Sequence, residues 1–370
     1  FEVMIEQEEI SVNPVLYRHQ HTVLCNIERF AEFSITHNDE LINGRSIASI
    51  LRPFTDHVFS SNLNLDEGRS NLGEFWHDRC RHTLEYIQKW SLSQPKQTAN
   101  QLFRNADFVS NRRTFKEIAY TLTCPRDDFD IVALRIGNII YLDEYNSYKY
   151  SSSSYRGYKF DQFLTMKASV SNEDPTKNEP FNIMARSDLV TANGESIGLT
   201  YSAEIDAIDN FGRYVEMKTR SLRTPSGVCF SRSVRDWLQS KMVGIDELLI
   251  GHHDNGIVQK IEQVPLQHEY NRCQRTCDAS LNFLATVLLK VKKRLFSQTG
   301  KYASCKLMFD KDGGRLWMDE ARLDNPNETE ILYPQFTHHL NMPITPFVIP
   351  HLNNNTHIDY NNNHTHSTYP

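Results

Sequence analysis

Five strand-like segments follow one another between residues 181 and 265, and they restrict the fold more than any other feature of the chain. In order, they read FNIMARSDLV, IGLTYSAEIDAI, RYVEMKTR, DELLIGHH and GIVQKIEQV. Apolar and β-branched residues dominate each segment, and turn residues separate them. Between the third and the fourth, SVRDWLQSKM has a helical pattern. This mixture predicts an α/β fold of the mixed α+β kind, built around a mixed sheet flanked by helices.

Helices and hairpins are predicted on both sides of this region. Residues 71–93 carry apolar side chains at helical spacing and predict an amphipathic helix. Residues 129–145 predict two apolar strands joined at Gly137. Residues 278–296 give the strongest helical pattern, and a basic last turn suits the helix dipole. A last hairpin is expected at 305–320, around the turn KDGG.

The remaining segments are polar and set the expected domain limits. Residues 150–157 and 170–180 predict loops, the first of which leads into a helix. Residues 351–370 are rich in Asn and His, have no core pattern and predict a disordered tail. No internal repeat is evident. We therefore expect a single domain over residues 1–350, with its functional motifs between about 107 and 258.

Composition excludes several classes of protein. The 370 residues are 39% hydrophobic, which is ample for a core. The net charge of −6 argues against a polycation that coats nucleic acid non-specifically. No run of 18 apolar residues occurs, so we expect no membrane-spanning helix. The chain begins at Phe1 with neither an initiator Met nor an apolar signal-like block, so its start carries no prediction about targeting.

Positive charge is concentrated between Gly212 and Lys241, where seven Lys or Arg face two acids. Such a run usually forms a solvated surface. Here it directly follows a group of acidic residues, which favours an anionic substrate held beside a metal.

The seven cysteines are odd in number and scattered, which favours reduced thiols and the cytosol or nucleus over a disulfide framework. Cys273 and Cys277 form the only close pair, at helical i,i+4 spacing. A zinc half-site there is conceivable, but no second pair has ligand spacing, so two ordinary helix cysteines are the favoured interpretation.

The stretch YSAEIDAIDNFGRYVEMKTR, residues 201–220, contains the most informative side chains of the chain. Strand residues two apart share a face, so Glu204 is expected beside Asp206 and Glu216 beside Lys218. Asn210 and Gly212 suit a turn that folds the two pairs together. Three carboxylates this close repel one another and raise one another's pKa unless a cation lies among them.

Hard oxygen ligands without Cys or His favour Mg²⁺ or Mn²⁺ over zinc. Such a site polarises a phosphoryl oxygen and activates water, and Lys218 would orient that water or neutralise developing charge. The alternative is a solvent-facing hairpin whose charges pair across the strands, worth about 0.2–1 kcal/mol per pair. Against that alternative, the opposite face is apolar throughout: Ala203, Ile205, Ala207, Val215 and Met217.

An acid followed by Glu-x-Lys on the next strand resembles the PD-(D/E)xK nuclease superfamily. The surrounding motifs are more specific and resemble the DXO decapping exoribonuclease family. In order, they are DFVSNRRTFKEI, RGYKFDQFL, SAEIDAID, YVEMKT, DWLQSKMVGI and LLIGHHDNGIV. The resemblance covers about residues 100–265, and EID with EMK is its most specific part.

This resemblance implies a single domain of twisted mixed sheets flanked by helices, with a PD-(D/E)xK core. It implies a metal-dependent decapping nuclease and RNA 5′ pyrophosphohydrolase that removes non-standard or incomplete caps, with or without 5′-to-3′ exoribonuclease activity. Two Mg²⁺ or Mn²⁺ ions are the implied cofactors. The implied partners are RNA 5′ ends (capped, NAD-capped or triphosphorylated) and a nuclear protein, with no membrane and no DNA. The implied location is the nucleus, with the cytoplasm as the alternative.

The family's functional residues fall on eight positions of this sequence. The implied metal ligands are Asp161, Glu204, Asp206, Glu216 and the backbone carbonyl of Met217. The implied catalytic residues are Lys218 and Gln239, and the substrate-binding residues are Arg112, Lys218 and Gln239. Trp237 is a candidate for base stacking, although a helical Trp is more often part of a core.

Three departures from the family pattern bear on activity. Asp161 stands where the family has Glu, and the shorter side chain displaces a ligand by about an ångström, a misplacement that costs on the order of 10²-fold in rate. Asn111 and Arg113 flank Arg112 in place of Trp and Gly, and His253 stands in place of Arg. Arg232 and Arg235 replace lysines and keep their charge.

The sequence leaves two functions of different classes. Retention of Glu204, Asp206, Glu216, Lys218 and Gln239 favours an enzyme that hydrolyses RNA 5′ ends. The altered positions favour a degenerate relative, similar to the Cutoff-like branch, that holds RNA 5′ ends or protein partners without turnover. A scaffold without an RNA site is the least favoured, because it gives the basic run no role.

Overall fold

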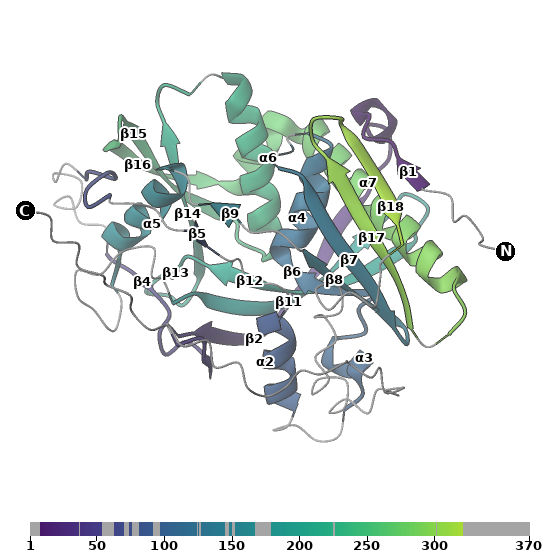
Figure 1. Ribbon diagram of the computed structural model, residues 1–370. Coiled ribbons are helices and arrows are strands. Elements are labelled where there is room, and N and C mark those ends of the chain that lie inside the picture. Colours follow the sequence, from purple (N-terminus) through teal and green to yellow (C-terminus); the bar gives the residue numbers. More distant parts are fainter. Residues whose placement is uncertain are drawn as a thin grey trace, which may run out of the picture.

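The computed structural model describes thirteen segments of the chain: residues 8–36, 38–53, 63–69, 74–75, 81–91, 97–123, 125, 127–144, 148–149, 152–166, 179–224, 226–300 and 302–320. Most of its strands belong to one large curved sheet (Figure 1). This ten-stranded sheet has the order β1 (Glu8–Ile10), β18 (Arg315–Asp319), β17 (Tyr302–Asp310), β7 (Phe129–Ile136), β8 (Ile139–Glu144), β6 (Phe108–Asn111), β12 (Ser196–Ile205), β11 (Phe181–Val190), β2 (Val23–Ile35) and β3 (Leu41–Asn43).

A second sheet of six strands adjoins the end of β12. Its order is β10 (Thr165–Met166), β4 (Ile50–Leu51), β13 (Ala207–Ile208), β14 (Tyr214–Ser221), β15 (Glu247–Asp254) and β16 (Ile257–Pro265). A separate pair joins β5 (Glu74–Phe75) to β9 (Tyr148–Lys149). The chain passes from the first sheet to the second at Asp206, which is a bend between β12 and β13. The central acidic stretch therefore lies where the two sheets meet.

Three helices pack on the concave side of the large sheet (Figure 1). They are α4 (Arg112–Thr121), α6 (Ser226–Met242) and α7 (Leu266–Ser297). They pack on one another, and α7 contacts strands of both large sheets. The short helices η1 (Pro14–Tyr17), α2 (Arg81–Ser91) and α3 (Ala99–Leu102), together with α5 (Ser152–Leu164), complete the described helices.

Side-chain alternation divides the interior into three cores. In β7, Ile131 and Ala133 face the core of α4, α6 and α7, whereas Val132 and Leu134 face a second core with α2. In β15, Leu248 and Ile250 belong to the first core, whereas Leu249 packs with α5 in the third. Buried strands with two apolar faces are expected where helices cover both sides of a sheet.

Most predicted elements are confirmed. The five strand segments form β11, β12 with β13, β14, β15 and β16, and both predicted hairpins are present as β7–β8 and β17–β18. Gly137 adopts a φ of 61°, as the β7–β8 turn requires. The mixed α/β class with sheets flanked by helices is also as predicted.

Other boundaries differ from the sequence expectation. Residues 152–157 begin α5 and are not a loop, because the helix continues into the apolar residues Phe160 and Leu164, which pack on the second sheet. Phe75 lies in β5, so the predicted 71–93 helix is described only from Arg81. The predicted 278–296 helix begins earlier, at Leu266.

Two expectations fall wholly or largely outside the described residues. The predicted loop at 170–180 is described only at Glu179 and Pro180, and the predicted tail at 351–370 not at all. The single domain over 1–350 stays a prediction. In the described part of the chain, no helix has the length and apolar character to cross a membrane.

Candidate active site

The site forms along one edge of β14 at the junction of the sheets. Ala207 and Ile208 pair with Val215 and Tyr214, and because β13 begins only at Ala207, β13 provides no partner for the part of the β14 edge beyond Val215. Asp206 takes that place, and its Oδ2 accepts a hydrogen bond of 2.6 Å from the backbone N of Met217. The acidic bend is thereby fixed beside the Glu-x-Lys strand.

The turn of this hairpin is built by Asp209. Its Oδ1 accepts from the backbone N of Phe211 at 2.9 Å and from that of Arg213 at 2.8 Å. Gly212 supplies the left-handed conformation, with a φ of 78°. The Asn210–Gly212 signal therefore marked the turn correctly, and the aspartate one residue earlier stabilises it.

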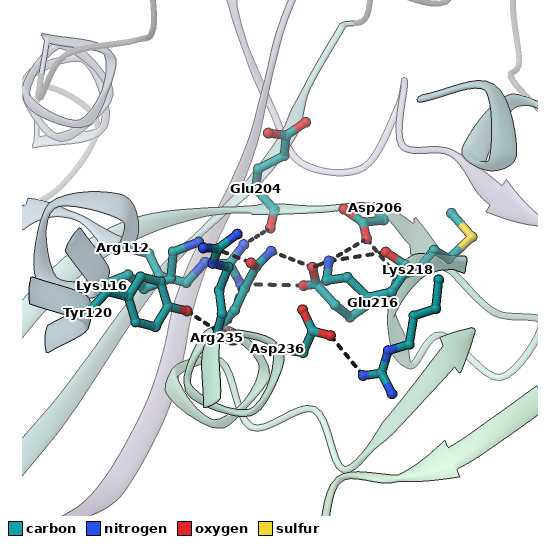
Figure 2. A network of polar contacts seen from close by, with 12 residues as sticks. Arg112, Lys116, Tyr120, Glu204, Asp206, Glu216, Lys218, Arg235 and Asp236 are labelled. Carbon is teal, nitrogen blue, oxygen red and sulfur yellow. Dashed lines mark hydrogen bonds and ion pairs between the residues drawn. The ribbon is translucent and has the colours of Figure 1, made fainter. Parts of the chain in front are cut away.

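Glu216 is at the centre of the polar contacts (Figure 2). It is 0% exposed, and its Oε1 accepts hydrogen bonds from Lys218 Nζ and Gln239 Nε2. Burial disfavours its charge, but the nearby cations Lys218 and Arg112 outweigh this and lower the pKa of Glu216 below its ordinary value. Its Oε2 has no hydrogen-bond partner, and Arg112 Nη1 lies 3.6 Å away.

Two of the other carboxyls have raised pKa values. Burial and the charge of Glu216 raise the pKa of Asp206 to about 7. Burial and Asp206 raise the pKa of Asp161 well above its ordinary value. Glu216 contributes to both shifts, so the three groups share one electrostatic environment.

Lys218 is the cation of this environment. Its Nζ donates to Glu216 Oε1, donates to the Met217 carbonyl at 3.1 Å and lies 3.8 Å from Asp206 Oδ2. Burial alone lowers its pKa, but Glu216 and Asp206 reverse the effect and raise the pKa above its ordinary value. Lys218 is therefore a charged donor and not a general base at neutral pH.

Two helices bring the remaining predicted residues to Glu216. β6 runs parallel to β12 and leads directly into α4, whose first residue is Arg112. Asn111, in place of the family's Trp, caps this helix by accepting from the backbone N of Thr114 at 2.9 Å. Arg112 donates to the carbonyls of Glu204 at 2.8 Å and Gln239 at 3.0 Å, and so ties α4 to β12 and α6.

The sequence-predicted residues are thus brought together with one difference. Direct contacts link Arg112, Asp206, Glu216, Lys218 and Gln239. The Glu204 side chain is exposed and points away from Glu216 in Figure 2, although its backbone carbonyl is part of the network. Strand alternation does not relate Glu204 to Asp206, because Asp206 is a bend.

The position of Asp161 depends on a close approach between α5 and β15. A Cβ on Gly251 would lie 2.5 Å from Phe160 Cε2, and Phe160 is fully buried. The absence of a side chain at Gly251 therefore lets α5 sit directly on the sheet and carries Asp161, the next residue, toward Asp206. Gly251 was part of a motif in the sequence, but this role was not predicted.

We expect Gly251→Ala to lower the free energy of unfolding by about 1–3 kcal/mol, because the added methyl overpacks the contact with Phe160. The measurement is urea denaturation. Gly157→Ala in the same helix is the control: its Cβ meets nothing within 4 Å, so it should stabilise the protein by about 0.5–1 kcal/mol. Equal effects of the two changes would contradict this account of the α5 contact.

The basic run between Gly212 and Lys241 is largely neutralised, which corrects the expectation that it faces an anionic substrate. Four of its seven basic residues form ion pairs: Arg213 with Asp209, Lys218 with Glu216, Arg220 with Asp236 and Glu269, and Arg223 with Asp254. Arg235 lies over the ring of Tyr120, 5.3 Å from its centroid. Asp209 before the run, and Asp254 and Glu269 after it, supply acids that the charge count within the run did not include.

Two further candidates, Trp237 and His253, are buried in structural contacts. Trp237 is 6% exposed and packs against Tyr270 in the main core, as expected for a helical Trp. His253 is 5% exposed, its Nδ1 accepts from the backbone N of Gly256 at 3.3 Å, and burial followed by Arg156 lowers its pKa. His253 is thus neutral at physiological pH and supplies no charge in place of the family's Arg.

Cys273 and Cys277 are buried, and their sulfurs lie 3.4 Å apart in α7, whose backbone is non-helical at Cys273. Cys273 Sγ also donates to the Glu269 carbonyl at 3.0 Å. No third ligand accompanies the pair, since the described residues contain no group of three or more His, Cys, Asp or Glu that could hold a metal ion.

The same finding applies to the acidic site: the described carboxylates do not form a ligand shell as they stand. The donor set nevertheless fits a hard divalent cation chemically. It consists of oxygen ligands alone, two of its carboxyls have raised pKa values, and Glu216 Oε2 is buried without a hydrogen bond.

Sequence reasoning missed Lys116, Asp236 and Glu269. Lys116 Nζ donates to Gln239 Oε1 at 3.0 Å, and the two acids hold Arg220. The i,i+4 spacing from Arg112 to Lys116 was the available signal for the first. No local sequence pattern indicated the cluster of Asp236 and Glu269 with Arg220, because Glu269 is far from Arg220 in the sequence.

Comparison with known proteins agrees with this geometry. The model of the family described as RAI1-like PD-(D/E)XK nuclease matches residues 27–337. The decapping nuclease dom-3 of Caenorhabditis elegans is 26% identical over 285 residues, covering 70% of this chain and 70% of that protein.

Two solved structures share the fold. S. pombe Rai1 in complex with 3′-FADP has a TM-score of 0.68 and 18% identity, covering 86% of this chain and 100% of that one. Candida albicans Rai1 in complex with pU5 and Mn²⁺ has a TM-score of 0.67 and 17% identity, covering 91% and 99%.

The fold and the family match place the protein in the PD-(D/E)xK class. Because the family match spans most of the chain, the protein belongs to the RAI1-like PD-(D/E)XK nuclease family, the family of the DXO-type decapping nucleases.

Proposed function

We propose that the protein is a metal-dependent hydrolase of RNA 5′ ends. It would remove non-standard or incomplete caps and 5′ pyrophosphate. The observation that carries the proposal is the arrangement at the β14 edge: Asp206 fixed beside Met217, Glu216 buried and charged, and Lys218 held against both acids. The family supplies the reaction class, and this arrangement retains its chemical groups.

Each side chain has a role in this proposal. Lys218 stays protonated and donates hydrogen bonds to the attacking water or to charge that develops on the phosphate. Gln239 places its amide beside Glu216 and orients the same water. Arg112 holds α4, α6 and β12 together around Glu216, and its remaining donor capacity serves the substrate phosphate.

Asp161, Glu204, Asp206, Glu216 and the Met217 carbonyl would hold Mg²⁺ or Mn²⁺, which supplies polarisation of the phosphoryl oxygen and a lowered pKa of water. The raised carboxyl pKa values mean that the charged forms are disfavoured in the metal-free protein, and a bound cation would stabilise them. Exoribonuclease activity, a nuclear protein partner and nuclear localisation are further parts of the proposal, carried by the family alone.

The substrate class follows from the ligands of the relatives. One of the two similar structures contains a 5′-phosphorylated uridine oligomer with Mn²⁺, and the other contains 3′-FADP, a dinucleotide with a pyrophosphate. We therefore propose that triphosphorylated and dinucleotide-capped RNA 5′ ends are the substrates of this chain.

A second function is favoured by one observation. His253 is neutral and buried where the family has Arg, which removes a charge from the site. A protein that binds RNA 5′ ends without hydrolysing them would tolerate that loss more readily than an enzyme would.

A turnover assay separates the two functions. Purified protein with Mn²⁺ should release pyrophosphate from 5′-triphosphorylated RNA and release the cap from NAD-capped RNA, and excess chelator should stop both reactions. The double variant Glu204→Ala with Asp206→Ala is the control for contaminating nucleases. If the wild type and the double variant are equally inert yet bind the RNA with equal affinity, the result supports the binding function instead.

A further inference from the structure

A row of side chains on α4 faces the candidate site from the side opposite Lys218. Arg112, Lys116 and Tyr120 are spaced by four residues and so lie on one face of the helix, toward α6 (Figure 2). Arg112 reaches the Gln239 carbonyl, Lys116 the Gln239 side chain, and Tyr120 the Arg235 carbonyl at 2.6 Å. Of the three, Lys116 alone contacts a predicted catalytic side chain.

This contact determines how the Gln239 amide is oriented. A protonated lysine can only donate, so its partner at 3.0 Å must be the amide oxygen, Oε1. The NH₂ group is then directed to the other side, where it donates to Glu216 Oε1. With the amide reversed, an oxygen would face the charged Glu216, and the NH₂ group would face the ammonium.

We propose that Lys116 is a positioning residue of the active site: it fixes the Gln239 amide so that its NH₂ group is presented to Glu216 and to the reacting water. The inference rests on the proposed function, since Gln239 is expected to act on the water. Lys116 acts through Gln239 and does not itself contact the substrate.

The surroundings of Lys116 favour a role over a chance placement. Burial, and then the charge of Arg112, lower its pKa to about 7, so the fold places this amine where its charged form is disfavoured, while its N–H groups still donate to Gln239. Glu117 and Glu216 are the acids that oppose the shift. A side chain that only packed against its neighbours would not require an amino group at this buried position.

A double-mutant cycle tests the inference in the active protein. Lys116→Met keeps the length of the side chain and removes the donor, and we expect a loss of about tenfold in kcat with little change in KM. Lys116→Arg restores the donor and should recover most of the loss. In a Gln239→Ala background, Lys116→Met should cost less than twofold more, because the residue it positions is gone. Fully additive losses would overturn the proposal.

A measurement without turnover separates this inference from the proposed function. In protein labelled with ¹⁵N at glutamine, the Gln239 side-chain amide is assigned by its disappearance in Gln239→Ala. Its exchange with solvent should be slow in wild type and Lys116→Arg, and about tenfold faster in Lys116→Met. An inert protein with this pattern would contradict the proposed function and support the role of Lys116. Equal exchange in wild type and Lys116→Met would overturn the role, whatever the activity.

Discussion

Asp206→Asn is expected to raise the stability of the metal-free protein and to abolish RNA 5′-end hydrolysis. The loss of rate should reach about three orders of magnitude, since a metal ligand contributes several kcal/mol to the transition state. The gain in stability has the opposite origin. The fold disfavours the charge of Asp206, whose pKa is raised to about 7 by burial and by Glu216. Asparagine keeps an oxygen for the hydrogen bond from Met217 N and removes that charge.

The pH dependence of stability follows from the same shift. The folded chain binds the Asp206 proton more tightly than the unfolded chain, in which the pKa is near 3.8. The free energy of unfolding of wild type therefore decreases as pH rises from about 4 to about 7. At pH 8 the asparagine variant should be more stable by about 2 kcal/mol, at about 1.4 kcal/mol per pKa unit with part of the shift shared with Glu216. Below about pH 4 the difference should vanish, because Asp206 is then protonated in both states.

Glu216→Gln is the matched control, because it makes the same chemical change at the neighbouring acid. The pKa of Glu216 is lowered, so the fold favours its charge, and the variant should be less stable at pH 8. Chemical denaturation with chelator present measures both variants, and the RNA assay measures their activity. If Asp206→Asn destabilises the protein at pH 8, or if it retains activity, Asp206 is a structural residue and not a ligand.

The fold was predictable wherever periodicity and turn chemistry act locally. β7 and β8 could be identified from two apolar runs around Gly137, and β11 to β16 from their strand patterns. The start of α5 could not, because Ser-rich residues have no strong helical pattern. The contact of Phe160 with Gly251, which holds that helix on the sheet, joins residues about ninety positions apart.

The site was predictable in composition but not in geometry. Alternation correctly paired Glu216 with Lys218, because β14 is a regular strand. It could not relate Glu204 to Asp206, since the chain bends between sheets at Asp206. The i,i+4 spacing places Lys116 on the same helix face as Arg112, but its role could not be predicted because it depends on how α4 and α6 pack.

The charge counted along the sequence was the least reliable predictor of which side chains face a substrate. Arg220 belonged to the run expected to face RNA, yet its side chain is 13% exposed. Its guanidinium contacts Asp236 at 2.8 Å and Glu269 at 3.0 and 3.1 Å, which are 9% and 1% exposed. The cluster joins β14, α6 and α7 and so supports the strand of Lys218 and the helix of Gln239.

Arg220→Met should therefore destabilise the protein by about 3–5 kcal/mol, as expected when one partner of a buried ion cluster is removed. Methionine fills much of the same space, so the loss comes chiefly from two buried carboxylates that lose their hydrogen-bonded counter-ion. The urea midpoint at pH 7.5 gives the measurement. The deficit should shrink toward pH 5, because the buried Glu269 carboxyl, once it has lost Arg220, can then take up a proton in the folded state.

Arg213→Met provides the control for loss of an arginine pair near the same strand. Its side chain is 65% exposed, and Asp209 keeps its backbone hydrogen bonds, so the change should cost less than about 1 kcal/mol. Adding Asp236→Asn and Glu269→Gln to Arg220→Met should recover much of the lost stability, since no buried charge then remains unpaired. If Arg220→Met costs no more than Arg213→Met, or if the two added changes deepen its loss, the cluster does not hold α6 and α7 against β14.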